Sequence, residues 1–250
     1  MRTPIIVANW KMYADSIALG SILATQIRNN TDKFQGVEVV LCPPSIWLTE
    51  IAQILKRGKV KLGAQNMFYE KDGPYTGEIS PSMIKEMADY VIVGHSERRE
   101  HFGETNFDVN EKVLAALKSD LTPIVCVGEK KKNSNLSQTA MELTEALHSV
   151  PKKDYDKIVV AYEPVWAISS YGKGENADPE YVAKVIVKLR EHVDAGTQII
   201  YGGSVKSANA EGYAKRPEID GALVGAASIR AADFIKVCQV WSEAKLSMNK

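Results

Sequence analysis

Cysteine is scarce in this sequence, and the three residues that occur show no recognisable pairing pattern. Cys42, Cys126 and Cys238 are odd in number, lie far apart and form no C-x-x-C motif. Neither a disulfide framework nor a zinc site is therefore indicated. We expect free thiols in a reducing, cytoplasmic setting.

An excess of one charge is also lacking. The 31 Lys and Arg residues balance the 31 Asp and Glu residues, so the formal net charge is zero. Nucleic-acid binders usually carry a clear basic excess, so we expect no nucleic-acid partner. No run approaches the roughly 20 apolar residues of a membrane span, and the start of the chain is too short and interrupted for a signal peptide. No membrane partner is expected either.

What the sequence does contain is an alternation of short β-branched runs with longer stretches of helical periodicity. This alternation predicts parallel strands joined by crossover helices. The runs 5–8 and 158–161 are continuously apolar, which suits strands buried on both faces. The eight expected strands are Ile5–Asn9, Val37–Leu41, Val60–Ala64, Tyr90–Val93, Ile124–Val127, Ile158–Tyr162, Gln198–Tyr201 and Gly221–Val224.

The number of these units indicates the fold class. Eight βα units in 250 residues, with no linker between them, predict an α/β fold in which a (β/α)8 barrel forms a single domain over residues 1–250. A doubly wound open sheet more often stops at about five or six strands. Ser80-Pro81 and Asp178-Pro179 mark two helix starts, because each places a capping side chain before a proline at the first helical position.

Active sites of such barrels lie on the loops that follow the strands, which makes polar residues at strand ends the candidates. Each has an ordinary structural explanation when taken alone: Lys11 as a surface charge, His95 as a capping residue, and Glu163 as the start of a turn. Their convergence on one mouth of the barrel favours function. The candidates are Asn9, Lys11, His95, Glu97, Glu163, Ser204, Gly225 and Ala226.

The glycine-rich turns do not form a nucleotide-binding motif. Neither the Walker pattern G-x-x-x-x-G-K-[ST] nor the Rossmann pattern occurs, so NAD is not implied. The turns after the seventh and eighth strands instead offer Ser204 and the backbone N–H groups of Gly225 and Ala226 to a phosphate, at a short helix start.

Several segments at the strand ends resemble the triosephosphate isomerase family, in the family's order from the first strand to the last. The two longest are too unusual in composition to be explained by chance. The segments are Ala8-Asn9-Trp10-Lys11, Val93-Gly94-His95-Ser96-Glu97-Arg98-Arg99, Cys126-Val127-Gly128-Glu129, Tyr162-Glu163-Pro164-Val165-Trp166-Ala167-Ile168, Tyr201-Gly202-Gly203-Ser204-Val205 and Gly221-Ala222-Leu223-Val224-Gly225.

This resemblance implies a TIM barrel and an isomerase of glycolysis and gluconeogenesis that needs no cofactor. The reaction would interconvert dihydroxyacetone phosphate and glyceraldehyde 3-phosphate through an enediolate. Glu163 would be the catalytic base, and His95 a neutral electrophile at the carbonyl and enediolate oxygens. Lys11 would supply positive charge, and Asn9 a further polar contact.

The resemblance also implies supporting residues. Glu97 and Cys126 would hold the catalytic groups without reacting themselves. The loop after the third strand would form a homodimer, with Thr76 approaching the neighbouring subunit's Lys11 region. Met67, Phe68 and Tyr69 in this loop are poor residues to leave in water, which favours burial against a partner.

The chain departs from the family's pattern at two places. The closing lid, Ser169 to Asn176, is about three residues longer than usual, and Ser169 stands where a glycine offers its backbone N–H to the phosphate. We expect the lid to close with an altered balance between open and closed states. Ala226 replaces a common second glycine but keeps the amide donor.

Two other hypotheses remain open from the sequence. In the first, Lys11 forms a Schiff base with a keto substrate in a barrel lyase, which borohydride would trap. In the second, the chain is a catalytically silent homologue retained for binding, because of its altered lid. The presence of Lys11, His95 and Glu163 together argues against the silent homologue.

Overall fold

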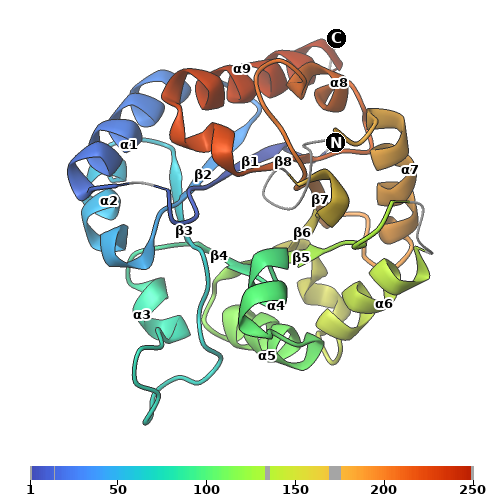
Figure 1. Ribbon diagram of the computed structural model, residues 1–250. Coiled ribbons are helices and arrows are strands. Elements are labelled where there is room, and N and C mark those ends of the chain that lie inside the picture. Colours follow the sequence, from blue (N-terminus) through green and yellow to red (C-terminus); the bar gives the residue numbers. More distant parts are fainter. Residues whose placement is uncertain (1, 14, 133–135, 169–175, 249–250) are drawn as a thin grey trace.

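Eight parallel strands form a closed barrel in the computed structural model, which describes residues 2–13, 15–132, 136–168 and 176–248. Each strand pairs with its sequence neighbours, and β1 closes the barrel against β8 (Figure 1). The expected (β/α)8 TIM barrel is confirmed. The strands are β1 (Ile5–Asn9), β2 (Glu38–Cys42), β3 (Lys61–Ala64), β4 (Tyr90–Val93), β5 (Thr122–Val127), β6 (Val159–Tyr162), β7 (Gln198–Tyr201) and β8 (Gly221–Val224).

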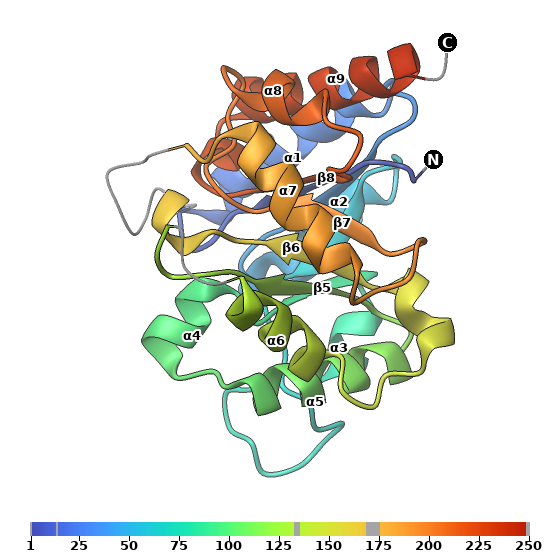
Figure 2. The same cartoon turned by 90° about the vertical axis from the view of Figure 1, so that its right-hand side faces the viewer.

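Helices surround this barrel on its outside (Figure 1, Figure 2). The predicted starts are present, since Ser80 caps α3 and Asp178 caps α7 through side-chain oxygens. The helices are α1 (Ile17–Thr31), α2 (Leu48–Leu55), α3 (Pro81–Lys85), α4 (Ser96–Phe102), α5 (Asn106–Lys118), α6 (Ser137–Ala146), α7 (Pro179–Arg190), α8 (Ala210–Ala214) and α9 (Ala231–Met248), with short 3-10 turns η1 (Ser45–Trp47), η2 (Lys152–Lys157), η3 (Val165–Ala167) and η4 (Ala226–Ile229).

The core has two layers, because side chains of a strand point alternately to its two faces. On β1, Ile5 and Val7 face the barrel interior, while Ile6 and Ala8 pack against the surrounding helices. Both faces are buried, which explains the continuously apolar runs of the sequence.

Barrel closure depends on a glycine at the start of β8. Gly221 has a φ of 143°, and a Cβ on it would lie 1.9 Å from the carbonyl oxygen of Ile5. An L side chain would meet both the strained φ and the backbone of β1. Gly221 therefore lets the last strand approach the first.

The three cysteines are free and buried. Cys42 and Cys126 point into the barrel interior, and Cys238 lies in α9. Burial raises the pKa of each thiol, so all three stay protonated. None of the helices in the described part of the chain has the length and apolar character needed to cross a membrane.

Candidate active site

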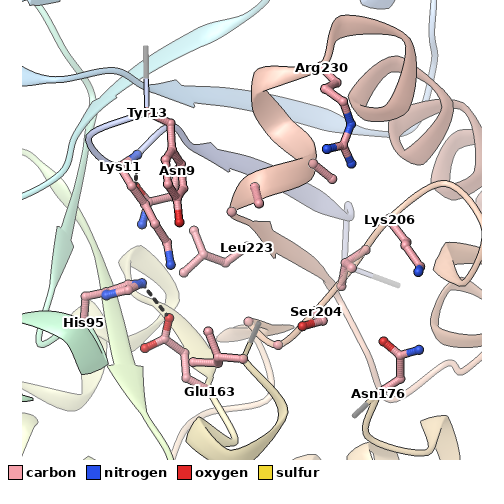
Figure 3. Close-up of a pocket in the computed structure, with 17 residues that line it drawn as sticks. Asn9, Lys11, Tyr13, His95, Glu163, Asn176, Ser204, Lys206, Leu223 and Arg230 are labelled. Atoms are coloured by element: carbon pink, nitrogen blue, oxygen red, sulfur yellow. Dashed lines mark hydrogen bonds and ion pairs between the residues drawn. The ribbon is translucent and has the colours of Figure 1, made fainter. Parts of the chain in front are cut away.

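Most of the predicted site residues line a single cavity at the carboxyl ends of the strands, with a volume of about 270 Å³ (Figure 3). Glu97 and Cys126 lie just outside it, against the catalytic candidates. Ser169 and the lid up to residue 175 fall outside the described residues, whereas Asn176 lines the cavity. The predicted residues that it brings together are Asn9, Lys11, His95, Glu163, Ser204, Gly225 and Ala226.

Lys11 is held in the cavity wall by contacts at both its ends. Its backbone lies in the left-handed region, with φ 49°, where its N–H donates to Asn9 Oδ1 over 3.0 Å. Gln65 donates to its carbonyl oxygen. The ammonium lies 2.5 Å from Glu97 Oε1. A non-glycine residue at such a φ needs surrounding structure to hold it, and these contacts provide it.

His95 caps the helix that follows β4. Its Nδ1 accepts the backbone N–H of Glu97 over 3.2 Å at the start of α4, the helical turn expected from the sequence. An accepting Nδ1 belongs to the neutral ring, which places the proton on Nε2. Nε2 lies 3.1 Å from Glu163 Oε1, so the ring can donate to this carboxylate (Figure 3).

Glu163 follows β6 and is only 2% exposed. Its second oxygen accepts the backbone N–H of Ser96 over 3.0 Å. Gly202 makes room for it, because a Cβ there would lie 2.7 Å from Glu163 Cγ. Burial, with the Glu163 carboxylate next in effect, raises the pKa of Cys126 well above the usual thiol range. Cys126 therefore packs beside this carboxylate as a neutral thiol, unsuited to nucleophilic attack.

A buried carboxylate anchors the start of the lid segment. Glu129 Oε1 accepts hydrogen bonds from Tyr162 at 2.8 Å, Trp166 at 2.9 Å and Tyr181 at 3.1 Å. Burial and then Glu129 raise the pKa of Tyr162 above its usual range, which keeps the phenol protonated as a donor. This network ties β6 and η3 to α7.

Removing Glu129 should cost considerable stability. We expect Glu129→Ala to lower the free energy of unfolding by about 2–4 kcal/mol, because three buried donors lose their acceptor. Tyr181→Phe, which removes one donor, should cost about 1 kcal/mol. Urea denaturation at a fixed protein concentration measures both. If the two variants lost the same free energy of unfolding, the idea that Glu129 is the acceptor for all three donors would be wrong.

The opposite end of the cavity is suited to an anion. Ser204 donates both its N–H and its hydroxyl to the carbonyl oxygen of Ala167, at 3.2 and 2.8 Å. A ligand that takes the Ser204 donors must therefore displace a carbonyl at the base of the lid. Gly225 and Ala226 lie at the start of η4, as expected.

Two cations of the cavity lining were not predicted from the sequence. Lys206 and Arg230 line the cavity, and Lys206 lies near Ser204 in Figure 3. Both lie within a few residues of the glycine-rich turns, so counting charged residues beyond those turns could have found them. Tyr13 and Leu223 also line the cavity without having been predicted. Among the residues described, no three His, Cys, Asp or Glu side chains cluster as metal ligands.

Comparison with known proteins agrees with this geometry. The family model for triosephosphate isomerase matches residues 4–241. The chain belongs to the triosephosphate isomerase family. It is 45% identical over 253 aligned positions to the triosephosphate isomerase of Caldanaerobacter subterraneus subsp. tengcongensis, covering 95% of this chain and 99% of that protein. It is 42% identical to that of Dehalococcoides mccartyi strain CBDB1, over the whole of both chains.

A solved triosephosphate isomerase has the same fold. The crystal structure from Bartonella henselae superposes with a TM-score of 0.83 at 34% identity, covering 96% of this chain and 99% of that one. The chain is therefore an enzyme with triosephosphate isomerase activity. This result excludes the silent homologue among the hypotheses drawn from the sequence.

Proposed function

We propose that one barrel domain spanning residues 1–250 interconverts dihydroxyacetone phosphate and glyceraldehyde 3-phosphate, with Glu163 as the base and His95 as the electrophile. The observation that carries this assignment is the 3.1 Å approach of His95 Nε2 to Glu163 Oε1 in the lining of one cavity. A base and a hydrogen-bond donor this close can act on neighbouring atoms of one small substrate.

The reaction begins with removal of a proton from the carbon beside the substrate carbonyl. Glu163 takes this proton, and the carbonyl oxygen becomes an enediolate oxygen that His95 Nε2–H stabilises. His95 has a single Nε2 proton, and here this N–H is directed at Glu163. When substrate binds, its carbonyl oxygen accepts this hydrogen bond in place of Glu163, and the carboxylate is free to act as the base. The hydroxyl on the first carbon then loses its proton and the enediolate oxygen gains one, with His95 Nε2 carrying the proton between the two oxygens, and Glu163 returns a proton to the former carbonyl carbon.

Charge on the substrate is balanced by the rest of the cavity. Lys11 supplies a cation beside the developing oxyanion, and Asn9 a further polar contact. The phosphate lies toward Ser204 and the backbone N–H groups of Gly225 and Ala226, with Ser169 contributing from the lid. Lys206 and Arg230 add positive charge at the same end.

The ion pair of Lys11 disfavours the Schiff-base alternative. A Schiff base needs a neutral amine with a free lone pair. The Lys11 ammonium donates to Glu97 Oε1 over 2.5 Å and is held there in an ion pair. Borohydride added with substrate is therefore expected to leave the protein unlabelled.

Solvent deuterium tests the proton-transfer route. A carboxylate that holds the abstracted proton exchanges it with solvent before returning it. Product formed in D2O is therefore expected to carry deuterium on the carbon that receives the proton, detected by NMR at early conversion. Substrate kept in D2O without enzyme gives the background. Product free of carbon-bound deuterium would instead indicate direct hydride transfer between the two carbons.

We also propose that the chain works as a homodimer. The segment between β3 and α3 projects from the barrel body (Figure 1, Figure 2). A groove of about 510 Å³ beside Lys11 has exposed apolar walls, with Met12 93% and Phe102 70% exposed. The projecting loop of a second copy, carrying Thr76, would fill this groove and cover the apolar walls.

One argument drawn from the sequence needs correction. Met67 is 1% exposed within the single chain, so its burial requires no partner. Phe68 and Tyr69 are half-buried and stack on each other with ring centroids 4.3 Å apart. The support for a dimer therefore comes from Met12, Phe102 and the groove.

A charge at the tip of the projecting loop should separate the subunits. Thr76→Arg is expected to give a monomer by light scattering. Its activity should fall on the order of 10²-fold, since the Lys11 region loses the loop that holds it in place. Thr144→Arg, at an exposed position of α6, is the matched control and should stay dimeric and active. A Thr76→Arg protein that is monomeric but fully active would refute any role of the partner in the site.

The enzyme is further proposed to act in the cytoplasm and without a cofactor. The three free, protonated thiols suit a reducing compartment. The proton transfers described above need no more than the side chains of the cavity.

A further inference from the structure

A second cavity lies at the amino ends of β1 and β8, on the face of the barrel away from the active site. Its volume is about 100 Å³, well above the roughly 10–15 Å³ that one water needs. The chain segments that form it come from both ends of the sequence. In Figure 2, α4 of the active-site mouth and the N-terminus lie on opposite sides of the molecule. The lining includes Arg2, Arg216, Asp220, Trp241 and Lys245.

Cations outnumber carboxylates around this cavity. Arg2, Arg216 and Lys245 line it, and Arg190 reaches it through Asp220. Asp220 is already fully engaged. Its Oδ1 accepts from Arg2 at 2.8 Å, and its Oδ2 accepts from Arg190 at 2.7 Å and from the backbone N–H of Ile199 at 2.9 Å.

The other nearby carboxylates do not line this cavity. Glu180 is 4.0 Å from Arg216 and pairs more closely with Lys184, at 2.9 Å. Glu218 and Glu191 line the adjoining surface hollow with Arg2 and Arg190, and Glu191 pairs with Lys188 at 3.0 Å. Among the described residues that line the cavity itself, Arg2, Arg216 and Lys245 are cations and Asp220 is the one carboxylate, which leaves an excess that a dianion would neutralise.

A buried donor in the same lining has no acceptor. Trp241 is 2% exposed, and its indole Nε1–H has no hydrogen-bond partner. Indole is a donor only, and leaving it unmatched in the interior is unfavourable. Lys245 uses one of its three N–H groups on the carbonyl oxygen of Arg2, at 2.6 Å, and has two more to offer.

We propose that this cavity is a second anion site, which binds a phosphate-class dianion through the Trp241 indole N–H, the Lys245 ammonium and the Arg216 guanidinium. The unmatched indole N–H needs an acceptor, and the excess positive charge of the lining favours an acceptor with two negative charges. The cavity provides the space for it. The ligand would link α9 to the segment that enters β8. Because β8 closes the barrel against β1, bound phosphate would stabilise the closure.

The indole N–H provides a direct readout. The protein has four tryptophans, and the loss of one indole signal in Trp241→Phe assigns the Trp241 resonance in ¹H–¹⁵N spectra. Inorganic phosphate is titrated at constant ionic strength, with sodium chloride as the balancing salt. The Trp241 signal should shift and saturate. Trp166 precedes Ala167, whose carbonyl oxygen accepts from Ser204 in the active-site cavity, so its signal is expected to report separately on phosphate bound there.

Arg216→Gln provides the discriminating variant. It should weaken the response of Trp241 to phosphate by about tenfold, as expected for loss of a charged hydrogen bond. The response of Trp166 and the isomerase activity should stay as in the wild type. Phosphate should also raise the melting temperature less in this variant. Lys245→Gln is a second test at an independent position, in case Arg216→Gln does not fold.

Further titrations identify the ligand. If the Trp241 signal responds more strongly to glycerol 3-phosphate than to inorganic phosphate, the ligand is a phosphate monoester. If inorganic phosphate gives the stronger response, the ligand is the free ion. The proposal is overturned if the Trp241 signal does not move at constant ionic strength. It is equally overturned if acetate moves it as far as phosphate does, or if Arg216→Gln and Lys245→Gln respond as the wild type does.

Discussion

Glu163→Gln is expected to lose isomerase activity on the order of 10³-fold in kcat, within the range of about 10² to 10⁴ that a general base contributes. The amide has nearly the shape of the carboxylate and can still accept from Ser96 N–H, but it cannot take a proton from carbon. KM should change little, because the phosphate contacts lie at the other end of the cavity. Steady-state kinetics in both directions measure the effect, and circular dichroism confirms folding.

Glu142→Gln is the matched control for this substitution. Glu142 is a half-buried carboxylate on α6 that accepts the backbone N–H of Gly128, and it does not line the main cavity. Its loss of charge should change kcat by only a few-fold. If Glu163→Gln kept wild-type kcat, or if both variants lost the same activity, Glu163 would not be the base.

Lys11→Met is expected to lower kcat/KM by about 10²- to 10³-fold, comparable to the removal of one oxyanion donor in other enzymes. The phosphate and the developing enediolate both carry negative charge, and Lys11 is the cation beside Asn9 and His95 in the cavity lining. We expect a higher KM as well as a lower kcat, since the cation attracts both substrate and transition state.

The Glu97 ion pair offers an internal control for Lys11. The substitution removes the ammonium that lies 2.5 Å from the Glu97 carboxylate, which is 24% exposed, so the charge of Glu97 is no longer balanced by Lys11 and can repel the substrate. The double variant Lys11→Met/Glu97→Gln separates the two effects. We expect its kcat/KM to stay as low as that of Lys11→Met, because a missing cation cannot be replaced by removing an anion. Recovery of most activity would mean that Lys11 serves only to neutralise Glu97.

Strand positions were predictable because local pattern and tertiary burial agree. Four of the eight strands, among them Ile5–Asn9 and Tyr90–Val93, have the predicted bounds, and the others shift by one or two residues. Parallel strands buried on both faces leave long apolar runs, which are the strongest pattern such a sequence can carry. β5 begins two residues before the predicted start, and Pro123 lies within the strand.

Residues outside the strand-end motifs were harder to predict. Lys206 and Arg230 line the cavity. They were not predicted because cations are common on surface loops and carry no distinctive sequence pattern. Met67 was misjudged because the apolar character of a loop residue does not reveal whether its own chain or a partner covers it. Trp241 and Arg216 line one cavity although they lie 25 residues apart, and no local pattern of the sequence indicates this.

By itself, the sequence determined the number of βα units, the closed barrel they form and the motif residues at the strand ends. These properties are local, since they follow from apolar periodicity, capping residues and short segments. Only the tertiary structure decided which of those side chains touch. The pairing of His95 with Glu163, of Lys11 with Glu97 and of Glu129 with three donors spans up to 86 residues of chain. Such contacts depend on how strands curve and pack around the barrel, which side-chain periodicity along the chain does not encode.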